Sequence, residues 1–197
     1  MKTLIKIDHI SKYFGEQQVL HEFSLEIKEG ERLVIMGPSG SGKSTLLNLI
    51  AKTDQDYTGV IERAPSLEEG IKIPYPIVFQ ENENLLPWKT VAGNLRVISK
   101  NKEVTPYLDM VGLIDAKDKK PHQLSGGMKQ RVGIARAIMC DSKVLLMDEP
   151  FSNLDGHLRE KMQALIVELT QRLGQTLIFV THDEVEAKAI ATRIIRI

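Results

Sequence analysis

The chain has 197 residues, of which 42% are hydrophobic and 26% charged, and this predicts one globular domain with a full core and no room for a second complete domain. The 26 basic residues balance the 26 acidic ones, so the overall charge gives no reason to expect a nucleic-acid partner, although it leaves room for a local basic patch. The single cysteine, Cys140, cannot form an internal disulfide, and no apolar run reaches the roughly 20 residues of a membrane helix, which favours a soluble chain in a reducing compartment.

The chain is expected to begin with two half-buried antiparallel strands. Apolar and polar residues alternate over 4–10 and again over 23–27, which is typical of such strands. Residues 11–15 lie between them and are expected to form a turn that carries two aromatic side chains, Tyr13 and Phe14.

A glycine-rich loop follows the next apolar run, which spans residues 33–36 and is expected to be a buried strand. The loop reads GPSGSGKST and leads into an apolar-periodic helix, so it fits the phosphate-binding pattern G-x-x-x-x-G-K-[ST]. Its backbone N–H groups are expected to surround phosphate oxygens at the helix N-terminus. Its residues are Gly37, Pro38, Ser39, Gly40, Ser41, Gly42, Lys43, Ser44 and Thr45.

Two side chains of this loop have expected roles. Lys43 can reach the outer phosphates, and the Ser44 hydroxyl can ligate Mg²⁺. The loop alone predicts only a nucleoside triphosphate, because many kinases and GTPases share it.

A strand over 76–79 ends at Gln80. The amide oxygen of Gln80 can ligate Mg²⁺ or orient a water molecule, although a lone glutamine after a strand is usually a surface residue. From residue 81 to about 120 the pattern changes to short helices and polar linkers.

A second anion site is predicted in the segment LSGGMKQR, residues 124–131. Ser125 is expected to cap a helix, and Gly126 and Gly127 leave bare N–H groups at its N-terminus. The polar residues 129–131 are expected between the apolar positions of this helix. One chain binds one triphosphate, so the two anion sites suggest a head-to-tail homodimer in which each copy completes its partner's pocket.

Two carboxylates end the buried strand over 144–147. Asp148 can hold Mg²⁺ beside Ser44, and Glu149 can polarise the water that attacks the outermost phosphorus. Another buried strand, over 176–180, ends near His182, which can donate to the terminal phosphate although a histidine at a strand end is more often structural.

The remaining elements are also read from the pattern. An amphipathic helix is expected over 156–173, a short helix over 184–190 capped by Asp183, and an edge strand over 193–197. Buried strands that alternate with helices predict an α/β fold with a parallel sheet and a ligand at the carboxyl ends of its strands.

Six motifs follow one another along the chain: the phosphate loop, Gln80, the LSGGMKQR signature, the strand VLLMDEP (144–150), the segment SNLD (152–155) and His182. These motifs, in this order, resemble those of ATP-binding-cassette (ABC) ATPases. The resemblance implies a P-loop NTPase (RecA-like) parallel sheet with an N-terminal antiparallel β part and an inserted helical subdomain. It divides one ATPase domain into an α/β core (1–80 and 135–197) and a helical part (81–134).

The resemblance also assigns roles. Glu149 would be the catalytic base, His182 the sensor of the terminal phosphate and Asp155 a contact across a homodimer. Ser125, Gly126 and Gly127 would close on the partner's ATP. An aromatic residue just before a glycine stacks on adenine in this family, which selects Phe14.

More narrowly, residues 78–95 and 121–138 resemble ATPase subunits of importers for nitrate, sulfonate and taurine. This implies ATP, Mg²⁺, a position on the cytoplasmic face of the cell membrane, and integral membrane permease subunits that pass substrate from an extracytoplasmic solute-binding protein. Trp88 would lie near the permease or be buried in a small helical core, and these two readings stay open. The alternative function is a soluble or regulatory cassette not coupled to transport, and a cassette for DNA repair would need a long insertion that this chain lacks.

Overall fold

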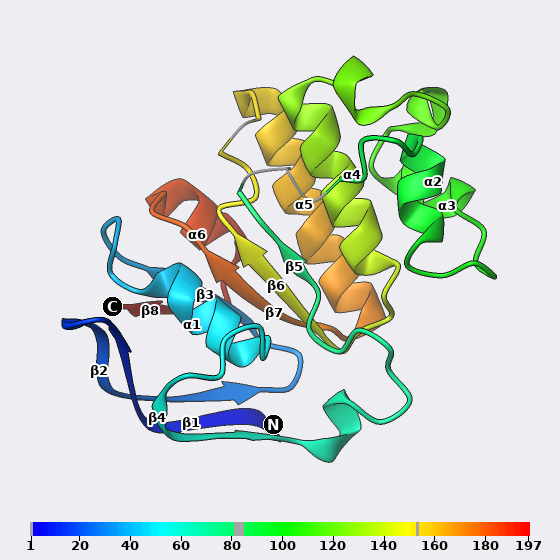
Figure 1. Ribbon diagram of the computed structural model, residues 1–197. Helices are drawn as coiled ribbons and strands as arrows, with labels where there is room; N and C mark the ends of the chain where they lie inside the picture. Colours follow the sequence, from blue (N-terminus) through cyan, green and yellow to red (C-terminus); the bar gives the residue numbers. More distant parts are fainter. Residues whose placement is uncertain (1, 81–84, 153) are drawn as a thin grey trace.

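The computed structural model describes residues 2–80, 85–152 and 154–197 (Figure 1). Residues 81–84 and Asn153, which belong to the predicted helical part and to the SNLD segment, lie outside the described residues. The described chain forms two sheets with helices packed against the larger one.

The smaller sheet is antiparallel, with the order β2-β1-β4. Its strands are β1 (Thr3–Phe14), β2 (Gln17–Lys28) and β4 (Thr58–Arg63). The turn predicted at 11–15 is wrong, because β1 continues through Phe14 and the chain reverses at Gly15 and Glu16. The pairing register shifts near His9, whose φ is 48°, and this irregularity leaves residues 10–12 buried in succession. A bulge therefore broke the alternation by which the strand was recognised.

The larger sheet is parallel throughout, as predicted. Its strands are β3 (Arg32–Met36), β5 (Ile77–Val78), β6 (Val144–Asp148), β7 (Thr176–Val180) and β8 (Arg193–Arg196). They follow the order β5-β6-β7-β3-β8, so β8 is an edge strand. The carboxyl ends of β3, β5, β6 and β7 are where the sequence predicted the phosphate loop, Gln80, the two carboxylates and His182, respectively.

Six α-helices are described. They are α1 (Lys43–Ile50), α2 (Val91–Arg96), α3 (Thr105–Met110), α4 (Gly126–Ile138), α5 (Gly156–Leu173) and α6 (Glu184–Ile190). Short 3₁₀ turns add Pro65–Leu67, Ile114–Ala116 and Pro121–Gln123. No helix in the described part of the chain is long and apolar enough to cross a membrane.

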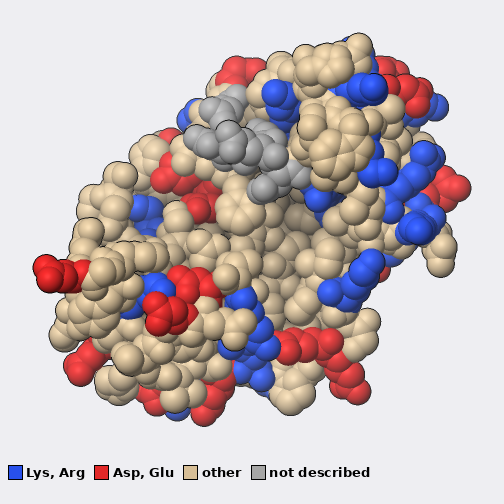
Figure 2. Space-filling view, in the orientation of Figure 1, with Lys and Arg blue, Asp and Glu red and all other residues tan. Residues whose placement is uncertain are grey.

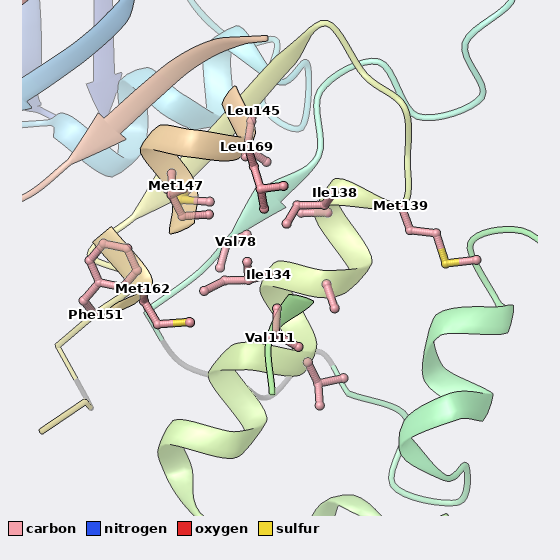
Figure 3. Packing of buried hydrophobic residues seen from close by; sticks show 14 of the residues in the cluster. Val78, Val111, Ile134, Ile138, Met139, Leu145, Met147, Phe151, Met162 and Leu169 are labelled. Carbon is pink, nitrogen blue, oxygen red and sulfur yellow. The ribbon is translucent and has the colours of Figure 1, made fainter. Parts of the chain in front are cut away.

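The parallel sheet separates two hydrophobic cores. One face of β6 presents Leu145 and Met147 to a core shared with α2, α3, α4 and α5 (Figure 3). The other face presents Val144 and Leu146 to a core shared with α1 and the antiparallel sheet. Side chains alternate between faces along a strand, so each buried strand needs apolar residues at every position.

The helical part lies on one side of this partition. Helix α4 packs against α2 and α3 and also against the sheet at β5. It runs without a break across residues 134 and 135, where the sequence placed a subdomain boundary. The division into core and helical part stays a prediction.

Candidate functional site

A cleft of about 280 Å³ opens where the phosphate loop meets the carboxyl end of β6. It is lined by Val19, Ser39, Gly40, Gly42, Lys43, Ser44, Thr45, Gln80, Asp148 and Glu149. The structure thus brings residues of the phosphate loop together with Gln80 and both carboxylates. All but one of these lining residues were predicted from the sequence.

The phosphate loop has the geometry of an anion cradle. Gly40 and Gly42 have φ values of 80° and 93°, which glycine adopts with little strain. The buried Lys43 ammonium donates to the carbonyl oxygens of Gly37 (2.9 Å) and Pro38 (2.6 Å). Ser41 Oγ is buried and has no hydrogen-bond partner among the described residues. A bound phosphate would satisfy such donors, and Lys43 is already directed into the loop.

Val19 is the lining residue that the sequence analysis missed. It lies on β2 of the antiparallel sheet, and its side chain and that of Leu20 contact the phosphate loop at Gly42. A β-carbon on Gly42 would lie 3.0 Å from both side chains. The antiparallel sheet therefore supports the loop directly. No local pattern around Val19 signals this contact, because it joins residues distant in sequence.

The oxygen atoms at the base of the cleft suit a magnesium ion. Ser44, Gln80 and Asp148 supply a hydroxyl, an amide and a carboxyl oxygen, the hard donors that Mg²⁺ prefers. Burial raises the pKa of Asp148, while a hydrogen bond from Ser44 and the charge of Lys43 act in the opposite direction. A nearby cation would stabilise the ionised form of this buried carboxyl. Within the described residues there is no group of three or more His, Cys, Asp or Glu side chains that could hold a metal alone.

Glu149 is held in an uncommon backbone conformation beside the cleft. Its φ is 44°, a region that residues other than glycine rarely adopt, and its N–H donates to the carbonyl oxygen of Val180 at 3.0 Å. Its side chain is 19% exposed and contacts His182, with 3.1 Å between Nδ1 and Oε2. Adjacent parallel strands thus place the predicted base and the predicted phosphate sensor in direct contact.

The signature segment lies outside the cleft. Ser125 caps α4 as predicted, and its Oγ accepts from the N–H of Met128 at 3.2 Å. None of Ser125, Gly126 and Gly127 is among the described residues that line the cleft. The chain brings its two predicted anion sites to different places.

Gln130 connects the signature helix to the cleft, a connection that the sequence analysis did not predict. It was expected to be one of the interleaved polar residues of the helix, but it is 1% exposed, and its Nε2 donates to the carbonyl oxygen of Phe79 at 3.0 Å. Phe79 directly precedes Gln80. A buried polar side chain therefore fixes the backbone from which Gln80 extends.

Asp155 and Phe14 also lie outside the cleft lining. Asp155 caps α5, and its Oδ1 accepts from the N–H of Leu158 at 2.9 Å. Phe14 is 55% exposed at the end of β1, and the Lys12 ammonium lies 4.9 Å from the centre of its ring. An exposed ring is available to stack on a planar base.

An arginine links the Asp155 turn to the His182 segment. Arg159 Nη2 donates to the carbonyl oxygen of Leu154 at 3.3 Å, and its guanidinium lies 3.6 Å from carboxylate oxygens of Asp183 and of Glu186. Glu186 is buried and accepts from Thr181 Oγ1 at 2.7 Å. Burial raises the pKa of Glu186.

Comparisons with known proteins agree on one family. The family model described as ABC transporter matches residues 20–152. The taurine import ATP-binding protein TauB of Escherichia coli O157:H7 is 41% identical over 201 residues, covering 98% of this chain and 78% of that protein. The nitrate import ATP-binding protein NrtC of Synechococcus elongatus is 38% identical over 213 residues, covering 99% of this chain and 32% of that protein.

Solved structures agree with the relatives. The dimeric structure of a bacterial ABC transporter cassette is 33% identical and superposes with a TM-score of 0.85, covering 98% of this chain and 94% of that one. The same cassette is also known as a dimer in a post-hydrolysis state bound to ADP and Pi, with a TM-score of 0.84 to this chain.

Proposed function

The chain belongs to the ABC transporter family, and from that premise we propose that it is the ATP-binding and ATP-hydrolysing subunit of a membrane importer. The observation that carries the proposal is the cleft in which the phosphate loop faces Asp148 and Glu149, with His182 in contact with Glu149. Relatives named as import ATP-binding proteins favour uptake of a small solute over the alternative of a cassette not coupled to transport.

The residues in and around the cleft have separate proposed roles in ATP binding and hydrolysis. The loop N–H groups and Lys43 bind the phosphates, and Phe14 stacks on the adenine. Glu149 accepts the proton of the water that attacks the terminal phosphorus. His182 orients Glu149 and donates to the terminal phosphate.

Ser44, Gln80 and Asp148 would hold Mg²⁺, which supplies positive charge to the phosphate oxygens when bound. The protein contributes only part of the ligand set, and phosphate and water oxygens complete it, as is common for Mg²⁺. The position of Asp148 supports this assignment, because it lines the same cleft as Ser44 and Gln80.

A second copy of the chain completes the site. In the proposed homodimer, Ser125, Gly126 and Gly127 of one copy close on the ATP held by the other, and Asp155 contacts the partner. The separation of the signature from the cleft within one chain supports this arrangement, as does the dimeric state of the similar cassette.

The permease is proposed to dock in an apolar groove. A hollow of about 390 Å³ lies between β5 and α4, with Phe79, Leu85, Ile98 and Arg136 among its lining residues. Phe79 precedes Gln80, so a permease segment in this groove would sense the cleft through Gln80 and Gln130. We also propose that the protein lies at the cytoplasmic face of the membrane and that a solute-binding protein acts through the permease.

The test is the substitution Glu149→Gln. It is expected to abolish phosphate release while ATP binding persists and ATP-dependent dimerisation becomes stronger, because the hydrolysis that would reopen the dimer no longer occurs. Glu160→Gln, an exposed carboxylate on α5, is the matched control and should hydrolyse ATP normally. Unchanged turnover in Glu149→Gln would refute the assigned base.

A further inference from the structure

The neutral chain carries an uneven distribution of charge. Over residues 85–143, basic residues outnumber acidic ones by 11 to 5, so the remainder of the chain carries the balancing negative charge. Figure 2 shows lysine and arginine side chains gathered over the side of the molecule where Figure 1 places α2 and α3. A local positive field therefore exists on a protein whose net charge is zero.

Two distant segments meet on this side. The N–H of Val91 donates to the carbonyl oxygen of Lys119, and the N–H of Ala92 donates to that of Lys117, both at 2.8 Å. The segment 117–120, which reads KDKK, is thereby held along the first turn of α2. Lys117, Lys119 and Lys120 are all exposed.

Basic residues in and beside α2 continue the positive charge. Lys89 lies just before the helix, Arg96 is its last residue, and Lys100 follows four residues later. Lys89 Cβ lies 3.2 Å from the position that a β-carbon on Gly93 would take, so the lysine stem packs against the first turn of α2. Arg96 and Lys100 are exposed, and Val97 beside them is 44% exposed.

An exposed tryptophan stands at the start of the same surface. Trp88 is 68% exposed, which is unusual for so large an apolar ring. Its loop is fixed from below by the buried Asn94, whose side chain bonds the N–H and carbonyl oxygen of Leu86 and the carbonyl oxygens of Lys89 and Thr90. The ring is thus presented to the outside on a supported turn.

We define the basic face as a set of residues in and beside α2 that are exposed, except for the half-buried Lys89. They are Trp88, Lys89, Arg96, Val97, Lys100, Lys117, Lys119 and Lys120. Asp115 and Asp118 add exposed negative charge beside the three lysines, and the exposed Glu103 follows three residues after Lys100. The face is separate from the proposed permease groove, whose lining contains none of these residues.

We propose that the basic face binds the anionic surface of a phospholipid bilayer. Trp88 enters the headgroup layer, where an amphipathic ring is favoured, and the lysine and arginine side chains meet lipid phosphates. Charge complementarity favours an anionic partner, and the exposed Trp88 beside the lysines suits the headgroup layer of an anionic bilayer. Direct lipid contact would add binding energy to that of permease docking. It would also orient the protein at the membrane surface.

Trp88 is the only tryptophan in the chain, so its fluorescence reports on the basic face alone. The full chain is mixed with vesicles of phosphatidylglycerol and phosphatidylcholine, and with vesicles of phosphatidylcholine only. The expected result is a blue shift of Trp88 emission and quenching by brominated acyl chains with the anionic vesicles, both lost at high salt. Absence of the shift and of the quenching would overturn the proposal.

The variant Lys117→Gln/Lys119→Gln/Lys120→Gln tests the charges. Each exposed lysine contributes roughly five-fold to anionic membrane binding, so the triple variant should bind vesicles on the order of 100-fold more weakly. The control variant Lys28→Gln/Lys161→Gln/Lys188→Gln changes the net charge equally at exposed positions on β2, α5 and α6. An equal loss in the control would refute the basic face as the contact.

Two further outcomes separate this proposal from others. A Trp88 shift that requires vesicles containing a permease, with none on pure anionic lipid, would overturn lipid binding in favour of a protein contact. ATP hydrolysis is measured in the same samples. If the protein hydrolyses ATP but does not bind anionic vesicles, the lipid proposal is wrong and the proposed function is unaffected.

Discussion

Gly42→Ala is expected to destabilise the fold more than the neighbouring substitution Gly40→Ala. Both glycines have a positive φ, 93° and 80°, so an alanine at either position is strained by about 1–2 kcal/mol. They differ in their surroundings. A β-carbon at Gly40 would meet nothing within 4 Å, whereas one at Gly42 would lie 3.0 Å from Val19 Cγ1 and from Leu20 Cδ2 and 3.1 Å from the carbonyl oxygen of Val19.

The difference between the variants isolates the contact between β2 and the phosphate loop. Relieving the close approach at Gly42 requires β2 or the loop to move, which adds about 1–3 kcal/mol. We therefore expect losses of about 1–2 kcal/mol for Gly40→Ala and about 2–5 kcal/mol for Gly42→Ala. At this chain length the extra loss lowers Tm by roughly 2–4 °C per kcal/mol.

The assay is urea denaturation without nucleotide, so that weakened ATP binding does not enter the comparison. Equal losses in the two variants would refute the reasoning that the antiparallel sheet supports the phosphate loop. A smaller loss for Gly42→Ala than for Gly40→Ala would refute it more strongly.

Three further predictions follow from other contacts. Ser125→Arg should abolish hydrolysis while ATP still binds to the monomer, and an active variant in a phosphate-release assay would contradict the shared site. Burial raises the pKa of the Cys140 thiol to about 11 from an ordinary value of 9.0, so at a pH below 9.0 the native protein should react with iodoacetamide roughly 100-fold more slowly than the urea-unfolded chain; equal rates would contradict this. Arg159→Ala should lower stability by about 1–3 kcal/mol at neutral pH, since the buried Glu186 loses its cation and its pKa rises further above the unfolded value. That loss should shrink as the pH falls through the raised folded-state pKa of Glu186 and should be gone near the unfolded value, and a loss that does not vary with pH in urea titrations would show that the ion pair is not its source.

The local patterns of the sequence predicted most of the elements and much of the cleft. Helix α5 and its stop at Gly174, whose φ is 61°, follow from apolar periodicity and one glycine. The phosphate loop, Asp148 and Glu149 were recognised because each stands in a fixed position relative to a buried strand. These features depend on neighbours in the sequence.

The errors arose where distant segments meet. The bulge near His9 broke the period of β1 and moved the predicted turn ahead of Phe14. Val19 and Gln130 belong to the site through contacts with Gly42 and Phe79, far from them in the chain. The sequence allows Trp88 to lie either near the permease or in a small helical core, and the structure shows it exposed on a loop that Asn94 supports.

The two cores on either side of the parallel sheet have a genetic consequence. Leu145 and Leu146 are adjacent in β6, yet they belong to different cores. A defect caused by Leu145→Ala should be suppressed by second-site changes among α2, α3, α4 and α5. Suppressors of Leu146→Ala should instead fall in α1 and the antiparallel sheet. Substitutions at adjacent residues of β6 are therefore compensated by different sets of residues. Each core can change in sequence with little need for compensating changes in the other.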